Sequence, residues 1–181
     1  MPTTKIMVIR HAEKPNGEPG IMPDGSQNPE ALTAAGWSRA RALVGLFNPQ
    51  GGRFADPRLA RPGSLFASGS DSLRPKQTLA PLAEALKLVI DANYLKGQED
   101  RLVAAAKNAG SVTLVAWQHE AIAKIATLIR GSANGIPPRW PGHRFDLVWV
   151  FDREDNGDWS FEQAPELALP GDSSQPIALN D

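Results

Sequence analysis

Residues Lys5 to Pro15 read Lys-Ile-Met-Val-Ile-Arg-His-Ala-Glu-Lys-Pro. The apolar run from Ile6 to Ile9 is rich in β-branched side chains, which predicts a central strand buried on both faces. Arg10 and His11 follow directly, and neither side chain belongs in such a core. In open α/β sheets, ligands bind at the carboxyl ends of the strands. We therefore expect His11 to carry out chemistry there, with Arg10 holding an anion beside it.

The bulk properties indicate one domain of ordinary composition. The chain has 181 residues, is 41% apolar and has a formal net charge of −1, so no overall field attracts nucleic acid or an anionic membrane. It has no cysteine, which excludes disulfides and cysteine-based zinc sites. No apolar run approaches the roughly 20 residues that span a bilayer. No signal-peptide pattern is present, and we expect a cytoplasmic protein.

Strand and helix patterns alternate after the opening stretch. Alternation of this kind predicts a mainly parallel central sheet in a three-layer α/β/α sandwich. Asn156-Gly157 predicts a hairpin between the last two strands. Strands are expected at residues 64–68, 88–90, 112–117, 145–151 and 159–162. Helices are expected at about 33–47, with Thr33 as the N-cap, and at 100–108. A further helix is expected to start between Asp71 and Pro75 and run to about Leu86, and another carries apolar residues from Ile122 to Ile129 and ends at Gly131.

The chain is predicted to form a single catalytic domain over residues 1–163. From Ala164 to the end, Pro, Ser, Asp and Gly dominate. We expect residues 164–181 to form a tail that is either poorly ordered or laid along the surface.

Charged side chains follow three of the predicted strands. The first strand leads to Arg10 and His11, the second leads through a serine-rich turn to Arg74, and a third leads to His119 and Glu120. Parallel strands place their carboxyl ends at one edge, so these groups are expected to converge. Guanidinium groups match phosphate oxygens in pairs, and the start of a helix at Arg74 adds backbone donors.

A histidine inside a phosphate pocket indicates nucleophilic catalysis. The neutral imidazole of His11 can attack phosphorus and form a phosphohistidine, which water then hydrolyses. Arg10 and Arg74 disfavour protonation of His11, and with His119 they stabilise charge on the transferring oxygens. A carboxylic acid is still required to protonate the leaving oxygen.

The order and spacing of these residues resemble the histidine phosphatase superfamily, which has the phosphoglycerate-mutase-like fold. The similarity runs from about Ile6 to Phe151. It implies that His11 is phosphorylated, that Arg10, Arg74 and His119 hold the phosphoryl group, and that no metal or organic cofactor is needed. The matching segments are Arg10-His11, Leu32-Thr33-x-x-Gly36-x-x-x-Ala40, Ser68 followed by Arg74-x-x-Gln77-Thr78, and His119.

The proton donor is left open among three carboxylates. An acidic residue next to the second histidine donates the proton in the acid-phosphatase branch, which favours Glu120. Mutase-like members take the donor from the segment after the second helix, where Glu99 stands, with Asp91 behind it. Glu13, on the loop after His11, is the third candidate.

Further residues are candidates for contact with the substrate. Lys14 is a candidate for contact with a substrate anion, and the alternative is a side chain that is only solvated. Arg139, Trp140 and Arg144 are candidates for the substrate side of the pocket, and the alternative for Trp140 is to fix the loop in place. His143 is expected to be an ordinary surface or structural residue. His119-Glu120 lacks the second histidine of a zinc protease helix, so no metal site is expected.

These features predict a phosphatase that hydrolyses a phosphomonoester or phosphoramidate. Its partner is a small phosphorylated molecule or a phosphoprotein, and phosphate is the product. Two alternatives remain: a mutase-type phosphoryl transferase, and a binding module that holds phosphate without turnover.

Overall fold

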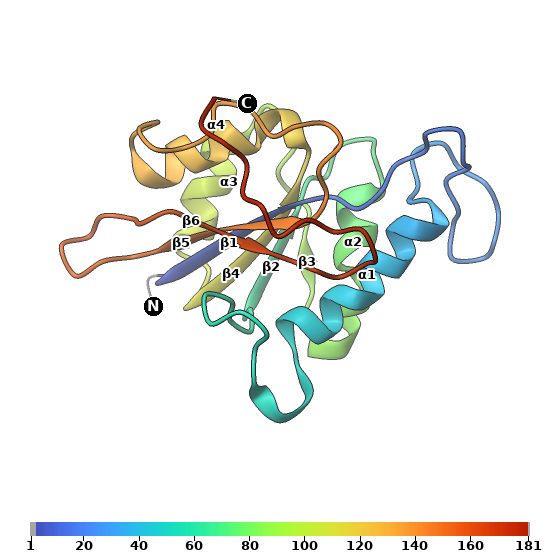
Figure 1. The fold of residues 1–181 in the computed structure, drawn as a ribbon, viewed down its shortest axis with the longest axis horizontal. Helices are drawn as coiled ribbons and strands as arrows, with labels where there is room; N and C mark the ends of the chain where they lie inside the picture. The colour runs from blue at the N-terminus through green and yellow to red at the C-terminus, as the bar shows by residue number, and fades with distance from the viewer. Residues whose placement is uncertain (1–2, 181) are drawn as a thin grey trace.

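The computed structural model describes residues 3–180, which form a six-stranded sheet with helices on both faces (Figure 1). The strand order is β3-β2-β4-β1-β5-β6. Strands β3, β2, β4 and β1 run parallel to one another, β5 runs antiparallel to β1, and β6 runs antiparallel to β5. The strands are β1 (Lys5–Arg10), β2 (Ser64–Ala67), β3 (Ile90–Asp91), β4 (Val112–Trp117), β5 (Leu147–Asp152) and β6 (Glu162–Pro165).

The helices cover the sheet in two pairs. The first two helices in chain order pack on one face of the sheet, and the last two pack on the other. The predicted three-layer α/β/α sandwich is therefore confirmed, and its sheet is mixed. The helices are α1 (Ala34–Phe47), α2 (Arg74–Leu86), α3 (Glu99–Ala106) and α4 (His119–Arg130), with a short 3-10 turn η1 (Gln50–Gly52). None of the helices in residues 3–180 is long and apolar enough to cross a membrane.

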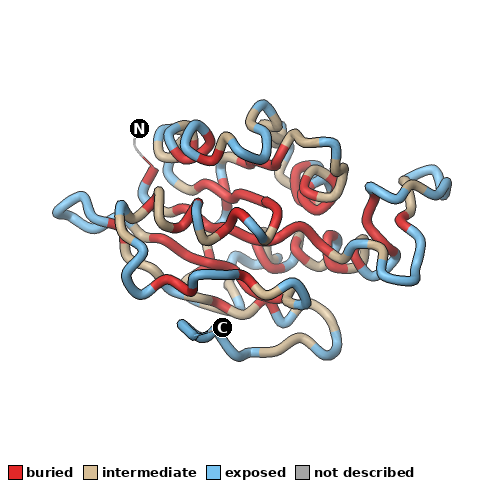
Figure 2. Tube along the Cα trace, turned by 90° about the horizontal axis from the view of Figure 1, so that it is seen from above, coloured by how far each residue is buried: buried red, intermediate tan, exposed pale blue. Residues whose placement is uncertain are grey.

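Strand β1 lies between β4 and β5 and is buried on both faces, as its sequence predicts. Buried residues run through the interior of the molecule, whereas the outlying loops are exposed (Figure 2). Ile6 and Val8 pack with α3 and α4, whereas Met7 and Ile9 pack with α1 and α2. All four side chains are fully buried. Burial of each contributes about 1.5–3 kcal/mol relative to exposure, which fixes the register of β1 and with it the position of His11.

The hairpin predicted from Asn156-Gly157 is present, but its regular strand begins later than expected. Trp159 makes only a single bridge, to Arg153, and β6 starts at Glu162 rather than at Trp159. The returning chain still keeps one register, since Ser160 pairs with Asp152 and Glu162 with Val150. Strand β3 also starts two residues later than predicted, at Ile90, because Lys87 closes α2 in the left-handed conformation and the chain needs more residues to reach the sheet.

Strand β6 continues across the predicted start of the tail at Ala164. Beyond it the chain lies along the body of the protein (Figure 1). Two of its side chains, Glu166 and Ile177, are buried. The composition of this segment does not reveal those contacts, because their partners lie far away in the sequence.

Candidate active site

The carboxyl ends of β1, β2 and β4 lie at one edge of the sheet. Arg10 is paired with Trp117, and Ala67 with Ala116, so the residues that follow these strands are neighbours. Because β5 runs antiparallel to β1, the segment that precedes Leu147 reaches the same edge. This topology gathers side chains from four separate parts of the chain.

His11 is buried, with 3% of its surface exposed. Its Nδ1 lies 2.7 Å from the carbonyl oxygen of Ala12. A carbonyl can only accept, so Nδ1 carries the proton of the neutral ring and Nε2 keeps its lone pair. Burial, with smaller contributions from the charges of Arg10, Arg74 and His119, lowers the pKa of His11 to about 3 against the opposing effect of the Ala12 carbonyl. The imidazole is therefore neutral at physiological pH.

The backbone beside His11 is held by α2. The amide of Ala12 donates to Thr78 Oγ1 at 2.8 Å, and the same hydroxyl donates to the carbonyl of Arg74 at 2.7 Å. Gln77 Oε1 accepts the amide of Leu32 at 2.8 Å. The sequence places Gln77-Thr78 in the resembling pattern but does not reveal this positioning role.

The start of α1 packs against the same segment. Thr33 Oγ1 accepts the amide of Gly36 at 3.2 Å, which confirms Thr33 as the N-cap, and the amide of Thr33 donates to the Glu13 carbonyl at 3.0 Å. A Cβ atom on Gly36 would lie 2.7 Å from that carbonyl oxygen. Glycine is therefore required there for the helix to approach the loop after His11.

Arg10 is 1% exposed and has only part of its guanidinium engaged. Its Nη1 donates to the carbonyls of Gly142 and Arg144, at 2.6 and 2.9 Å, and its Cζ lies 3.8 Å from the centre of the Phe145 ring. Its Nε and Nη2 are buried and have no partner among the described residues. Burial lowers the pKa of Arg10 to about 10, so it stays charged at neutral pH.

Arg74 begins α2, within the predicted range for the start of that helix. Its Nη1 donates to the Pro29 carbonyl at 3.0 Å, and its Nη2 lies 3.6 Å from Glu30 Oε2. The Nε is buried without a partner in residues 3–180. Buried donors normally find acceptors, so the free nitrogens of Arg10 and Arg74 indicate a place for an anion with several oxygens.

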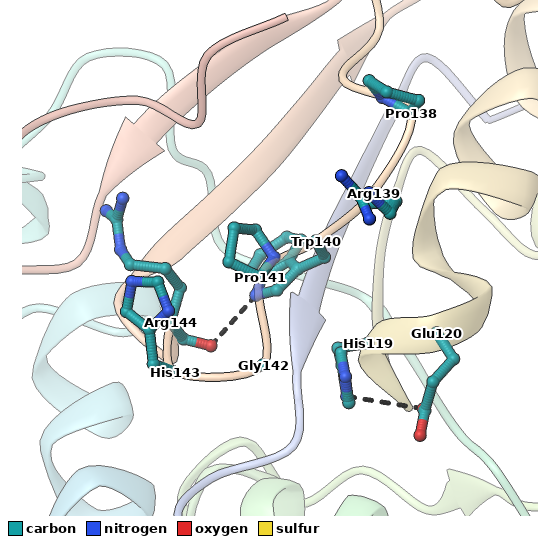
Figure 3. Close-up of a pocket in the computed structure, with 9 residues that line it drawn as sticks. All are labelled: His119, Glu120, Pro138, Arg139, Trp140, Pro141, Gly142, His143 and Arg144. Atoms are coloured by element: carbon teal, nitrogen blue, oxygen red, sulfur yellow. Dashed lines mark hydrogen bonds and ion pairs between the residues drawn. The ribbon is translucent and has the colours of Figure 1, made fainter. Parts of the chain in front are cut away.

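His119 and Glu120 begin α4 and line a pocket of about 800 Å³ (Figure 3). His119 Nδ1 lies 3.4 Å from Glu120 Oε2, and a Cβ atom on Gly142 would lie 3.5 Å from His119 Nε2. Burial, Arg10, Lys14 and Lys96 lower the pKa of His119, whereas Glu120 acts to raise it. The remaining lining residues come from one loop: Pro138, Arg139, Trp140, Pro141, Gly142, His143 and Arg144.

Glu120 is the candidate acid that faces this pocket. Its side chain is 54% exposed, and its Oε2 is 3.7 Å from Lys96 Nζ. Partial burial acts to raise its pKa, but its own backbone amide and the charges of His119, Lys96 and Arg10 lower the pKa overall. Glu120 is therefore ionised in the free protein.

The other candidate carboxylates are engaged elsewhere. Glu99 is 2% exposed, and it accepts from the Gly97 amide, Trp117 Nε1 and Lys124 Nζ at 2.8, 3.2 and 3.2 Å. Burial acts to raise its pKa, but these donors lower it overall. Glu13 Oε1 lies 2.8 Å from Nη2 of the buried Arg39.

The other predicted contact residues lie around the site. Lys14 is exposed and lines a neighbouring hollow of about 660 Å³ on the other side of Gly142. Arg139 is exposed at the rim of the larger pocket, whereas Trp140 is 2% exposed and pins the loop through a bond from its Nε1 to the Arg144 carbonyl. The exposed His143 lines both hollows.

Sequence reasoning missed Gln118, which stands immediately before His119. Its Nε2 donates to Ser68 Oγ at 3.1 Å, and its Oε1 is buried without a partner in the described part of the chain. A polar side chain directly after the buried strand β4 was the available signal. Within residues 3–180, no group of three or more His, Cys, Asp or Glu side chains is arranged to hold a metal ion.

Solved structures with the same architecture identify the fold. The chain resembles the protein histidine phosphatase SixA in complex with tungstate, with a TM-score of 0.57 and 16% identity over 90% of this chain and 97% of that one. The chain has the histidine phosphatase fold. No family model and no curated protein sequence matches the chain.

Two further histidine phosphatase folds match over a similar extent. A mycobacterial glucosyl-3-phosphoglycerate phosphatase gives a TM-score of 0.56 at 12% identity, covering 88% of this chain and 97% of that one. A phosphoserine phosphatase from Entamoeba histolytica in complex with phosphoserine gives 0.55 at 10%, covering 88% and 95%. The predicted phosphoglycerate-mutase-like fold is thus confirmed, while the role of each site residue stays a prediction.

Proposed function

We propose that this protein is a phosphatase that hydrolyses a phosphomonoester or phosphoramidate through a phosphohistidine on His11. One observation carries the proposal: a buried neutral histidine with a free Nε2 lies within the electrostatic reach of two arginines that have unpartnered, buried nitrogens. A nucleophile without a proton and a cationic cradle for oxygens are the two requirements of such a transfer. The fold shared with phosphatases supports the same reaction class.

The first step transfers the phosphoryl group to the protein. Arg10, Arg74 and His119 bind its oxygens, and His11 Nε2 attacks phosphorus while the bond to the leaving atom breaks. The leaving atom takes a proton from Glu120. In the second step water attacks the phosphohistidine and gives a proton back to Glu120. The P–N bond breaks, phosphate leaves, and His11 returns to its neutral state.

Glu120 has the best position of the three candidate acids. It faces the pocket beside His119, whereas Glu99 accepts three hydrogen bonds and Glu13 is paired with Arg39. Its lowered pKa belongs to the free protein. A bound phosphate dianion adds negative charge beside it, which raises the pKa and favours the protonated form that the first step needs.

The substrate side is an open pocket and not a closed slot. It offers one exposed guanidinium, Arg139, and the ring of His143 to the part of the substrate beyond the phosphorus. Both a small phosphorylated molecule and a phosphorylated side chain of a protein fit such an opening.

Labelling with radioactive acetyl phosphate tests the proposal. Phosphohistidine is stable in base and labile in acid, so a label that survives a base quench, disappears after an acid quench and is absent from His11→Ala supports the enzyme. A wild-type protein that takes no label, and turns over no member of a panel of aryl phosphates, sugar phosphates and phosphoramidate, would leave the phosphate-binding module as the better account.

A further inference from the structure

Arg39, in the middle of α1, joins three carboxylates from distant parts of the chain. It is 4% exposed, and its nitrogens contact Glu13 Oε1 at 2.8 Å, Glu166 Oε2 at 2.7 Å and Asp172 Oδ1 at 2.8 Å. Two of these carboxylates belong to the C-terminal segment and the third belongs to the loop after His11. The guanidinium fork suits such a junction because it holds several oxygens in fixed directions.

One member of this cluster, Glu13, stands two residues after the proposed nucleophile, His11. Glu13 is held through its side chain by Arg39 and through its carbonyl by the amide of Thr33. We call residues 11–14 the nucleophile segment. Its conformation depends on contacts with Thr78, α1 and, through Arg39, the C-terminal chain.

The C-terminal chain also reaches the loop that holds Arg10. The amide of Ser173 donates to Asp146 Oδ2 at 2.7 Å, and Arg144 Nη2 donates to the Gln175 carbonyl at 2.7 Å. Arg144 Nε and Asp146 Oδ1 are also 2.7 Å apart. The carbonyl of this same Arg144 accepts a hydrogen bond from Arg10.

We propose that residues 166–175, here called the C-terminal brace, position both the nucleophile and the phosphate-binding arginine. The brace holds the nucleophile segment through Arg39 and Glu13, and it holds Arg10 through Asp146 and Arg144. Asp172 gives the brace its own shape, since its Oδ2 accepts the amides of Ala168 and Leu169 at 2.8 and 3.1 Å. Arg39 and Asp172 are thus positioning residues. The kinetic part of the inference rests on the proposed function.

The variant Asp172→Asn tests the brace. It removes one charge at constant shape and weakens the hold on Arg39. Catalytic groups displaced by about 1 Å lose up to about 10²-fold in rate, so we expect kcat for an aryl phosphate to fall about tenfold or more with little change in KM. Hydrogen exchange of peptides covering residues 11–14 and 142–146 should become faster, while exchange in β1 and β4 should not.

A matched control comes from another Asp–Arg pair. Asp56 lies 2.7 Å from Arg58 in the connection before β2, and its side chain is 15% exposed. Asp56→Asn should change the melting temperature to a similar degree but leave kcat and the exchange at both segments unchanged. All variants are compared well below the lowest melting temperature.

The exchange measurement does not require catalysis, so it separates this inference from the proposed function. An inactive wild-type protein would contradict the proposed phosphatase activity. The brace would still predict faster hydrogen exchange at both segments in Asp172→Asn. If that variant does not fold, Arg144→Gln is measured in its place, with the effect expected at residues 142–146 and on kcat. The brace would be contradicted if hydrogen exchange at these segments stayed unchanged, or if kcat fell no more than it does in the control variant.

Discussion

At the mouth of the pocket, Glu120 is the carboxylate whose role the chemistry of the leaving group can reveal. We expect Glu120→Gln to slow hydrolysis of an alkyl phosphate by about 10² to 10⁴-fold, the usual contribution of a general acid. An activated aryl phosphate leaves without a proton, so its rate of phosphoenzyme formation should change little. Single-turnover kinetics with the two substrates checks this, and Glu99→Gln serves as the comparison. Equal slowing of both substrates would move the role to another carboxylate.

The sequence predicts that Arg10, His11, Arg74 and His119 converge, because parallel strands place their carboxyl ends at one edge of the sheet. The environments of Glu13 and Glu99 do not follow from it. Glu13 pairs with Arg39 of α1, and Glu99 accepts hydrogen bonds from Trp117 and Lys124. Such pairings depend on how the layers pack, which no local pattern in the sequence records.

Among the elements, the core strands are predicted well from their continuous apolar runs and the core helices from their apolar period. The start of α2 at Arg74 follows from Pro75, and the end of α4 from Gly131. The C-terminal segment has no such period. Its order depends on Arg39, Asp146 and Gln163, whose contacts with it become apparent only in the folded chain.

Glu166, the residue after strand β6, makes the stability of the folded protein depend on pH. Complete burial raises the pKa of Glu166 to about 8, with Asp172 and Glu13 adding to the effect and Arg39 opposing it. Between about pH 4.5 and 8 the folded protein keeps a proton that the unfolded chain loses, so stability falls as the pH rises. In Glu166→Gln this loss should be absent.

Urea denaturation of both proteins at about pH 5 and pH 9 measures this difference. The wild type should lose on the order of a few kcal/mol more than Glu166→Gln between these conditions. The two proteins should differ least at the lower pH, where the native carboxyl is neutral like the amide. The same pH dependence in both would show that Glu166 is ionised in the folded protein.

For the molecule as a whole, hydrolysis and transfer to a second substrate differ in what reaches the phosphohistidine. The pocket is open, and Glu120 is more than half exposed, so bulk water has access to the group that would activate it. No described segment encloses an acceptor beside His119. We therefore expect water to receive the phosphoryl group even when an alcohol competes.

Inorganic phosphate released from an aryl phosphate should equal the phenol released, with and without a phosphorylated or free alcohol at high concentration. The mutase-type transferase would be supported instead if more phenol than phosphate were released. The missing phosphoryl groups would then be found on the alcohol, in a fraction larger than the mole fraction of alcohol in the solvent.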